Sequence, residues 1–318
     1  MSRFASLDLG TNTFRLLIAD MSGNQTIVPI LLKREMTRLG QGLKDHASLK
    51  PQAMKRCLNV LEDFSKIIDR YKVEKAFAVT TSAAREAKNG QDFIDQIYRR
   101  TGIQARILTG SEEAALTLKG VFSVVDGTES MNLVVDIGGG STELILTEGI
   151  SPIQTTSIGL GAVHLLENLI ASDPPALHEL DDLRKYIHNI LQQFDILNYL
   201  CKCKSSNACS VQPRLIGTAG TVTSLAAIDQ MMEEYDPQKI NNYVLTREAV
   251  ENIFQHVCSI SIAKRKAIPG LEKGREAVIV PGAAILIAIM DLFSFDQLIV
   301  SDAGLLEGIL LDAQTTYS

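Results

Sequence analysis

The 318-residue chain lacks the features of several broad classes of protein. Its five cysteines are an odd number in a long chain, which argues against a disulfide framework. The formal net charge is −6, so no excess of positive charge is present to bind a nucleic acid polymer. An anionic substrate is still compatible with this charge if a local basic groove receives it.

A long apolar segment is also missing. The N-terminal stretch MSRFASLDLG contains no apolar core of a secretory signal peptide. The most apolar stretch, residues 277–290, is shorter than the roughly 20 residues that span a bilayer, and Pro281 interrupts it. We interpret it as the end of a strand followed by a buried helix. We therefore expect a cytoplasmic protein that does not bind membranes.

Three of the cysteines, Cys201, Cys203 and Cys209, lie in the polar segment CKCKSSNAC. Clustered thiols can bind zinc. Reduced cysteines in a surface loop are the interpretation that we favour.

Two common nucleotide-binding motifs are absent as well. The chain has no G-x-x-x-x-G-K-[ST], which excludes a P-loop. The glycines at 138–140 follow a predicted strand, as those of a dinucleotide fingerprint do. The next segment, TELILTEG, alternates like a strand where that fingerprint needs a helix.

What the chain does contain is an internal repeat with an offset of 128 residues. SLDLGTNTFRLLIADMSG aligns with VVDIGGGSTELILTEG, so that Asp8 matches Asp136 and Arg15 matches Glu143. Each copy predicts a strand, a tight glycine turn and a second strand. Because the offset is about one domain length, we predict two domains of the same plan. They comprise residues 1–125 and 126–302, and the C-terminal helix, about 303–318, packs back on the first.

Helices and strands are predicted to alternate between and after the two hairpins. The predicted helices cover residues 51–71, 91–100, 111–125 with Ser111 as N-cap, and most of 162–200 with a break at 173–175. A strand runs into a polar loop over residues 75–90, another strand begins at residue 105, and residues 214–229 and 297–313 are each a strand, a turn and a helix. This alternation indicates α/β architecture with partly parallel sheets between helices.

Three segments combine a tight turn with hydroxyl groups: DLGTNT, DIGGGST and GTAGTVTS. Glycine lets the backbone approach a ligand closely, and clustered N–H groups form an anion-binding nest. The third turn opens a helix, whose N-terminus favours phosphate. The predicted phosphate-binding residues of these loops are Asp8, Gly10, Thr11, Asn12, Thr13, Gly138, Gly139, Gly140, Ser141, Gly217, Thr218, Ala219, Gly220 and Thr221.

Carboxylates flank the second of these loops, with Asp136 before the glycines and Glu143 after them. Two carboxylates repel a phosphate unless a cation stands between them. Mg²⁺ suits this role because it binds few carboxylates together with waters and substrate phosphate. We predict that Asp136 and Glu143 hold Mg²⁺ or another divalent cation, with Asp8 as a further ligand. A turn-capping role is the structural alternative for Asp136.

Two adjacent acids, Glu112 and Glu113, lie in the first turn of a predicted helix. Compensation of the helix dipole would explain both. Adjacent helical residues point about 100° apart, so at most one of them could face a cleft and orient a water for attack on phosphorus. Arg15, Arg85 and Lys88 are candidate phosphate contacts, for which arginine offers bidentate geometry. The alternative for each is a solvated surface residue.

Together these motifs resemble those of the exopolyphosphatase/guanosine pentaphosphate phosphohydrolase (Ppx/GppA) phosphatases, in their short two-domain form without the C-terminal helical region of longer members. The stretches that carry the resemblance span nearly the whole chain in order: DLGTNTFRLLIA, TTSAAREAKN, ILTGSEEAALTLKGV, LVVDIGGGSTELIL, IGTAGTVTSLAA, IPGLEKGREAVIVPGAAIL and VSDAGLLEGIL.

The resemblance implies two actin-like (ribonuclease H-like) domains, the fold of sugar kinases and Hsp70, with the active site in the cleft between them. It implies hydrolytic release of the terminal phosphate from inorganic polyphosphate or from pppGpp. The family's catalytic glutamate falls on Glu113, its metal- and water-associated acids fall on Asp136 and Glu143, and its loop arginine falls on Arg85.

Two positions depart from the family. Leu306 and His164 stand where relatives often have arginine, so a long anionic chain would find fewer cationic contacts here.

Two other functions are left open. An actin-like ATPase or sugar kinase would use the same loops for ATP, but it would give Glu113 no role. A regulatory protein would bind guanosine polyphosphates with little turnover. A homodimer would be unsurprising for this chain whatever its function, since most soluble oligomers are symmetric.

Overall fold

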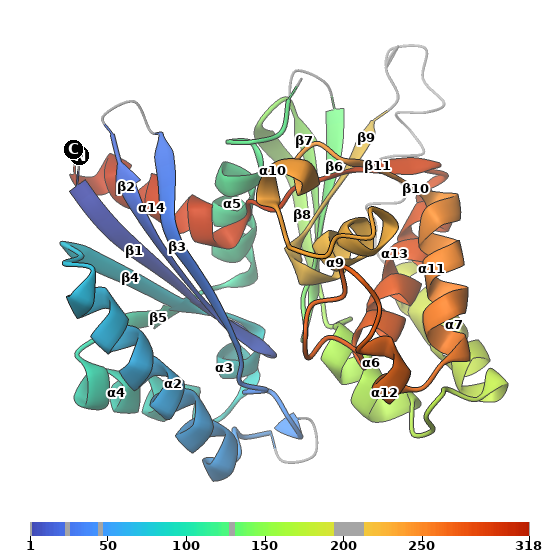
Figure 1. The fold of residues 1–318 in the computed structure, drawn as a ribbon, viewed down its shortest axis with the longest axis horizontal. Coiled ribbons are helices and arrows are strands. Elements are labelled where there is room, and N and C mark those ends of the chain that lie inside the picture. The colour runs from blue at the N-terminus through green and yellow to red at the C-terminus, as the bar shows by residue number, and fades with distance from the viewer. Residues whose placement is uncertain (1, 23–25, 44–46, 127–130, 194–212, 318) are drawn as a thin grey trace. The chain divides into compact units, whose positions relative to one another are not determined.

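In the computed structural model, the chain folds into two β-sheets with helices packed on their faces (Figure 1). The structure describes residues 2–22, 26–43, 47–126, 131–193 and 213–317. Unit 1 comprises Met1–Gly120 and Gly304–Ser318, and unit 2 comprises Val121–Ala303. The domain boundaries expected from the sequence, near residues 125 and 302, stay predictions.

The sheet of unit 1 has the strand order β3-β2-β1-β4-β5. Its strands are β1 (Ser2–Leu9), β2 (Thr13–Met21), β3 (Ile27–Met36), β4 (Lys75–Thr80) and β5 (Ala105–Ile107). β1 and β2 form an antiparallel hairpin, and β3 is antiparallel to β2. β4 runs parallel to β1, and β5 runs parallel to β4.

The sheet of unit 2 repeats this plan and adds one strand at its edge. Its order is β8-β7-β6-β9-β11-β10. The strands are β6 (Met131–Ile137), β7 (Thr142–Glu148), β8 (Ser151–Ile158), β9 (Arg214–Thr218), β10 (Val244–Thr246) and β11 (Gln297–Val300). The first five positions have the same strand directions as in unit 1. The predicted α/β fold with two units of the same actin-like plan is therefore confirmed.

The hairpin register confirms the sequence alignment of the two copies. Asp8 lies opposite Arg15 in the first hairpin, and Asp136 lies opposite Glu143 in the second. Directly opposed residues of an antiparallel pair project from the same face of the sheet. Each hairpin therefore presents one aspartate and one further charged side chain side by side.

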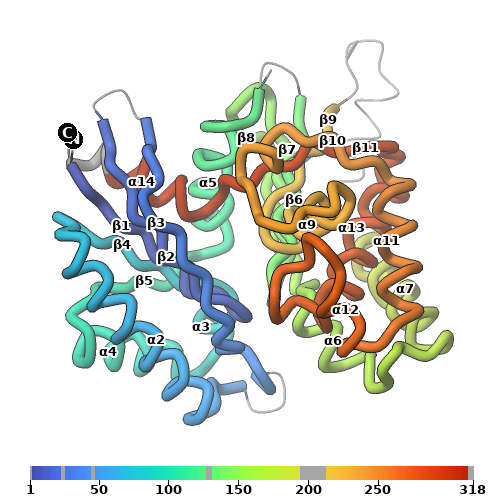
Figure 2. Tube along the Cα trace, viewed as in Figure 1, coloured from blue at the N-terminus to red at the C-terminus, as the bar shows by residue number. Residues whose placement is uncertain are grey.

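The core of unit 1 lies on both faces of its sheet. Its helices are α2 (Pro51–Arg70), α3 (Ser82–Glu86), α4 (Gly90–Thr101), α5 (Gly110–Val121) and α14 (Leu305–Tyr317). Side chains alternate along a strand, so Leu16 packs with Phe64 of α2 and Phe93 of α4, whereas Leu17 packs with Leu306 and Leu310 of α14. Figure 2 shows α14 returning to the strands of the N-terminal hairpin.

This packing assigns Leu306 to the apolar core. The side chain is only 2% exposed and contacts Leu17, Ala19 and Met21. An arginine there would lose its hydration in an apolar cluster, which disfavours a charged side chain. Leucine at this position is explained by packing in unit 1.

In unit 2 the helices surround an apolar central helix. They are α6 (Ala162–Leu169), α7 (Leu177–Leu191), α9 (Ala219–Asp229), α10 (Pro237–Ile240), α11 (Arg247–Ser259), α12 (Ile262–Arg265) and α13 (Ile279–Phe293). Nearly every residue of α13 is buried. A helix that is apolar on all sides belongs in a core, and α13 packs there against α7 and α11.

Four predictions about local structure need correction or lie outside the described residues. The strand end predicted near residue 277 is wrong, because helix α13 begins at Ile279 and accommodates Pro281 in its first turn, where no N–H is required. The predicted polar loop after β4 contains the short helix α3. The N-cap of α5 is Thr109 and not Ser111, as described below. The cysteine cluster at 201–209 lies outside the described residues.

No helix in the described ranges is long and apolar enough to cross a membrane.

Two glycines allow α5 and α14 to approach closely. A Cβ on Gly308 would overlap the backbone carbonyl of Leu116, and one on Gly120 would overlap the carbonyl of Gly304. Backbone atoms cannot move aside as a flexible side chain can. The close packing of α14 on α5 therefore requires glycine, which has no Cβ, at positions 120 and 308.

Gly308→Ala should destabilise the protein by roughly 1–3 kcal/mol, the usual range for overpacking. Gly159→Ala is the matched control, because a Cβ on Gly159 meets no atom within 4 Å. Urea unfolding of both variants measures the difference. Equal midpoints for the two variants would contradict the close approach of the helices.

Candidate active site

The first glycine loop, residues 10–12, joins β1 to β2, and its carbonyl groups are held by the segment that follows β3. The N–H groups of Thr37 and Arg38 donate to the carbonyl of Asn12 at 3.0 and 2.9 Å. The N–H of Gly40 donates to the carbonyl of Thr11 at 2.9 Å. Both loop carbonyls therefore point toward residues 37–40.

The second loop, residues 138–140, joins β6 to β7 and is held in the same way by the start of α6. The N–H of Ala162 donates to the carbonyl of Gly138 at 3.0 Å, and that of Val163 donates to the carbonyl of Gly139 at 2.9 Å. Gly161 comes so close to this loop that a Cβ on it would overlap the backbone of Gly139 and Gly140.

These hydrogen bonds determine where the loop N–H groups point. In a planar trans peptide the N–H is directed opposite to the preceding C=O. The carbonyls of Thr11, Gly138 and Gly139 point toward the segments that hold them. The N–H groups of Asn12, Gly139 and Gly140 therefore point away from those segments, which we call outward. In the described part of the chain these three N–H groups meet no acceptor. The successive N–H groups of Gly139 and Gly140 are arranged as in an anion-binding nest, and Asn12 offers one N–H of the same kind in unit 1.

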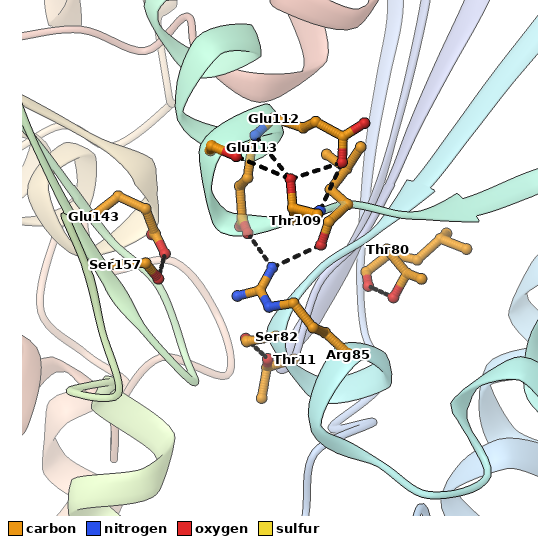
Figure 3. A network of polar contacts seen from close by, with 12 residues as sticks. Thr11, Thr80, Ser82, Arg85, Thr109, Glu112, Glu113, Glu143 and Ser157 are labelled. Atoms are coloured by element: carbon orange, nitrogen blue, oxygen red, sulfur yellow. Dashed lines mark hydrogen bonds and ion pairs between the residues drawn. The ribbon is translucent and has the colours of Figure 1, made fainter. Parts of the chain in front are cut away.

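Hydroxyl groups fix the strand ends beneath the loops. Thr80 donates its hydroxyl to the carbonyl of Leu9 at 2.9 Å, and the hydroxyls of Thr11 and Ser82 are 2.9 Å apart (Figure 3). In unit 2, Thr221 donates to the carbonyl of Ile137 at 3.4 Å. Thr11, Thr221 and the equally buried Ser141 therefore belong to the framework of the loops as well as to their predicted ligand surface.

The third segment passes directly from β9 into α9. Ala219 adopts φ +67° at this junction, a left-handed conformation that a residue with a Cβ rarely takes. The Thr218 hydroxyl donates to the carbonyl of Ala303 at 3.1 Å. Gly217 packs so closely on Val222 and Leu298 that a Cβ would overlap their side chains. Strained backbone of this kind clusters at ligand-binding sites.

Arg275 lies against the third segment and was not among the residues predicted from the sequence. A Cβ on Gly220 would overlap the guanidinium of Arg275. The Arg275 Nε donates to Glu272 Oε2 at 2.6 Å, and the side chain is 13% exposed. The segment GREAVIV carries part of the family resemblance, but its sequence contains no sign that the arginine reaches the start of α9.

The acids of the second hairpin form one row with their neighbours across three strands. Asp136 lies opposite Glu143, which lies opposite Ser157 on β8. Glu143 is only 2% exposed, and Ser157 donates its hydroxyl to Glu143 Oε1 at 2.8 Å (Figure 3). Two adjacent carboxylates, of which Glu143 is buried and Asp136 is partly exposed, repel each other unless a cation offsets them. Their oxygen donors fit Mg²⁺, which uses one or two carboxylates.

The matching row of the first hairpin is electrically different. Arg15 donates to Asp8 Oδ2 from Nε at 2.9 Å and from Nη2 at 2.6 Å. Asp8 is 6% exposed, so this ion pair is largely removed from solvent. Among the described residues no group of three or more His, Cys, Asp or Glu side chains is arranged to hold a metal. A metal-ligand role for Asp8 and a phosphate contact by Arg15 stay predictions.

The two adjacent glutamates of α5 have different surroundings (Figure 3). Glu112 accepts the N–H of Thr109 at 2.8 Å, while the Thr109 hydroxyl accepts the N–H of Glu112 at 3.2 Å. This reciprocal pair is a capping box. The hydrogen bonds from the Thr109 backbone and hydroxyl lower the pKa of Glu112. Glu112 therefore stabilises the start of the helix.

Glu113 points to Arg85 of α3, the short helix after β4. Its Oε2 accepts Arg85 Nη1 at 2.9 Å, and the same Nη1 donates to the carbonyl of Leu108 at 2.9 Å (Figure 3). Glu113 is 7% exposed, so the ion pair holds the carboxylate in one orientation. Lys88 is exposed on the following turn. Phosphate contacts by Arg85 and Lys88 stay predictions.

Comparisons with known proteins cover nearly the entire chain. The profile of the Ppx/GppA phosphatase family matches residues 17–316. The chain is 32% identical to the bifunctional 3-dehydroquinate synthase/phosphatase of Fusobacterium nucleatum, over 97% of this chain but only 46% of that protein's length. It is 29% identical to exopolyphosphatase 2 of Mycobacterium tuberculosis, over 98% of each.

A solved structure is similar over the same extent. The Ppx/GppA family member of Aquifex aeolicus has a TM-score of 0.78 and 30% identity, with coverage of 100% of this chain and 99% of that one. The family profile includes the second and third loops, both glutamates of α5 and the row of Asp136 and Glu143. Both the sequence and the fold therefore place this chain in the Ppx/GppA phosphatase family.

Proposed function

We propose that this protein hydrolyses phosphoanhydrides and releases the terminal phosphate of inorganic polyphosphate or of pppGpp. The observation that carries the proposal is the pair of loops whose carbonyls are tied inward and whose N–H groups of Asn12, Gly139 and Gly140 are turned outward. Backbone N–H groups in this arrangement bind phosphate oxygens without a side chain. Membership of the Ppx/GppA family and similarity to an exopolyphosphatase support the same reaction.

Glu113 is the residue to which we assign proton transfer. A water oxygen attacks the terminal phosphorus, the bond from that phosphorus to the bridging oxygen breaks, and Glu113 takes a proton from the water. The remaining phosphate chain leaves with the negative charge. The ion pair with Arg85 holds the carboxylate in place at 2.9 Å, as a general base requires.

Asp136 and Glu143 are the residues to which we assign the metal. They would hold Mg²⁺ or another divalent cation, whose charge would offset that of the phosphate oxygens. The hydrogen bond from Ser157 fixes one oxygen of Glu143, so the carboxylate has a defined orientation before any ligand binds. Arg275, beside Gly220 at the start of α9, adds a cation for phosphate binding in unit 2.

Phosphate release from tripolyphosphate, long polyphosphate, pppGpp and ATP, measured side by side, tests the proposed function. We expect tripolyphosphate or pppGpp to be hydrolysed at least as efficiently as long chains. The net charge is −6 and Leu306 is buried, so extended cationic contacts are few. Release from ATP alone would favour an actin-like ATPase, and tight binding of pppGpp without release would favour a regulatory protein.

The two glutamates of α5 should differ on substitution. Glu113→Gln should lower turnover by roughly 10²–10⁴-fold, the range for loss of a general base, while substrate still binds. Glu112→Gln is the matched control, since its carboxylate is occupied by Thr109, and it should leave turnover nearly unchanged. Steady-state phosphate release gives both values. A larger loss in Glu112→Gln would show that the wrong glutamate has been assigned.

Hydrolysis should depend on a divalent cation. EDTA should abolish phosphate release and Mg²⁺ should restore it, because two acids beside an anion site need a compensating charge. Asp136→Asn and Glu143→Gln should each raise the Mg²⁺ concentration needed for half-maximal rate. Ser157→Ala, which removes one orienting hydrogen bond but no charge, should raise it less. Full activity in metal-free buffer would exclude this assignment.

A further inference from the structure

The segment that holds the first glycine loop, residues 37–40, is itself firmly held. We call it the strap. Its three N–H donors bind the carbonyls of Thr11 and Asn12, and Leu39 is fully buried. From α2, Arg56 donates to the carbonyl of Thr37 at 2.6 Å and to that of Arg38 at 3.2 Å. Hydrogen bonds therefore fix the strap on two sides.

Arg38 occupies an unusual place on the strap. Its φ is +50°, in the left-handed region that is unfavourable for a residue with a Cβ. Thr37, Leu39 and Gly40 are buried, whereas Arg38 is exposed. Strained backbone that persists because its surroundings hold it is concentrated at ligand-binding sites.

Arg38 differs from Arg15 and Arg85 in that its guanidinium has no carboxylate partner among the described residues. Arg15 is paired with Asp8, and Arg85 is paired with Glu113. For the guanidinium of Arg38, the described residues provide no ion pair and no hydrogen bond. Its backbone N–H donates to the carbonyl of Asn12 at 2.9 Å, so Arg38 lies directly beside the loop.

Among the described residues of unit 2, the donors that hold the second loop include no arginine or lysine. There the carbonyls of Gly138 and Gly139 are held by Ala162 and Val163 at the start of α6, and the N–H of His164 also donates to the carbonyl of Gly139 at 3.3 Å. All three side chains are buried. In the described part of the chain, an exposed arginine among these donors is therefore found at the first loop and not at the second, although the backbone arrangement is common to both.

We propose that Arg38 is a substrate-binding residue whose guanidinium binds a phosphate group held at the loop of residues 10–12. This inference rests on the proposed function, because the ligand is the phosphate chain of that substrate. A planar guanidinium donates two parallel hydrogen bonds to a phosphate, which neither a backbone N–H nor a lysine can reproduce. The strap places Arg38 beside the loop, and the loop supplies the N–H of Asn12.

The test replaces Arg38 with asparagine, which tolerates the left-handed conformation and removes the charge. With tripolyphosphate as substrate, Arg38→Asn should raise KM by roughly 10- to 100-fold, the range for a lost charge-assisted hydrogen bond. kcat should stay within about twofold, since the general base and the acid pair are untouched. Arg38→Lys should give an intermediate KM. The slope of log KM against log salt concentration should fall for Arg38→Asn, because one charge contact is missing.

Lys72→Asn is the matched control. Lys72 is also an exposed cation with positive φ, +53°. It lies near the opposite end of β1, because the neighbouring Glu74 donates its N–H to the carbonyl of Arg3. KM and its salt dependence should not change in this variant.

Calorimetric binding of tripolyphosphate to Glu113→Gln protein, with and without Arg38→Asn, separates this inference from the proposed function. Binding that weakens roughly 10-fold or more in the double variant supports the role of Arg38, even if the wild-type protein releases no phosphate. Unchanged affinity would overturn it, even if phosphate release by the wild-type protein is confirmed. A fall in melting temperature with equal loss of kcat would also overturn it, since Arg38 would then only shape the strap.

Discussion

Both candidate phosphate loops depend on the hydrogen bonds that neighbouring backbone N–H groups donate to the loop carbonyls. Without donors from residues 37–40 and from the start of α6, the peptides of Thr11 and Gly139 could rotate and direct their oxygens toward the ligand. A phosphate would then meet partial negative charge in place of N–H groups. The helices and outer strands of each unit serve this geometry, because they fix the segments that supply the donors.

Much of this arrangement could be predicted from the sequence because each copy of the repeat is one short, continuous segment. The aspartate, the glycine two residues later and the apolar run together predict a hairpin, and the period of two residues in a strand then brings Asp136 beside Glu143. The spacing of helical residues likewise indicated that Glu112 and Glu113 could not share one role, and the capping box with Thr109 explains their different surroundings. Their catalytic and metal-binding roles stay predictions.

Other parts depend on contacts between distant segments, for which a sequence pattern contains no signal. Arg275 reaches Gly220 only because the loop before α13 passes the start of α9. Leu306 is explained by its packing on Leu17, a contact that the departure from the family pattern alone could not indicate. The end of a strand was expected near residue 277 because a short apolar run with a proline resembles one, whereas the length of the apolar segment favours a buried helix.

The two hairpins differ at one equivalent position, which is Arg15 in the first and Glu143 in the second. This difference changes the electrostatics of two otherwise similar hairpins. In one copy the aspartate is balanced by an internal ion pair with the arginine. In the other copy two carboxylates lie opposite each other, which is the reason for the divalent cation proposed there. A single change of side chain at an equivalent position can thus give two units of the same backbone plan different electrostatic properties, and only the second has the acid pair to which a cation is assigned.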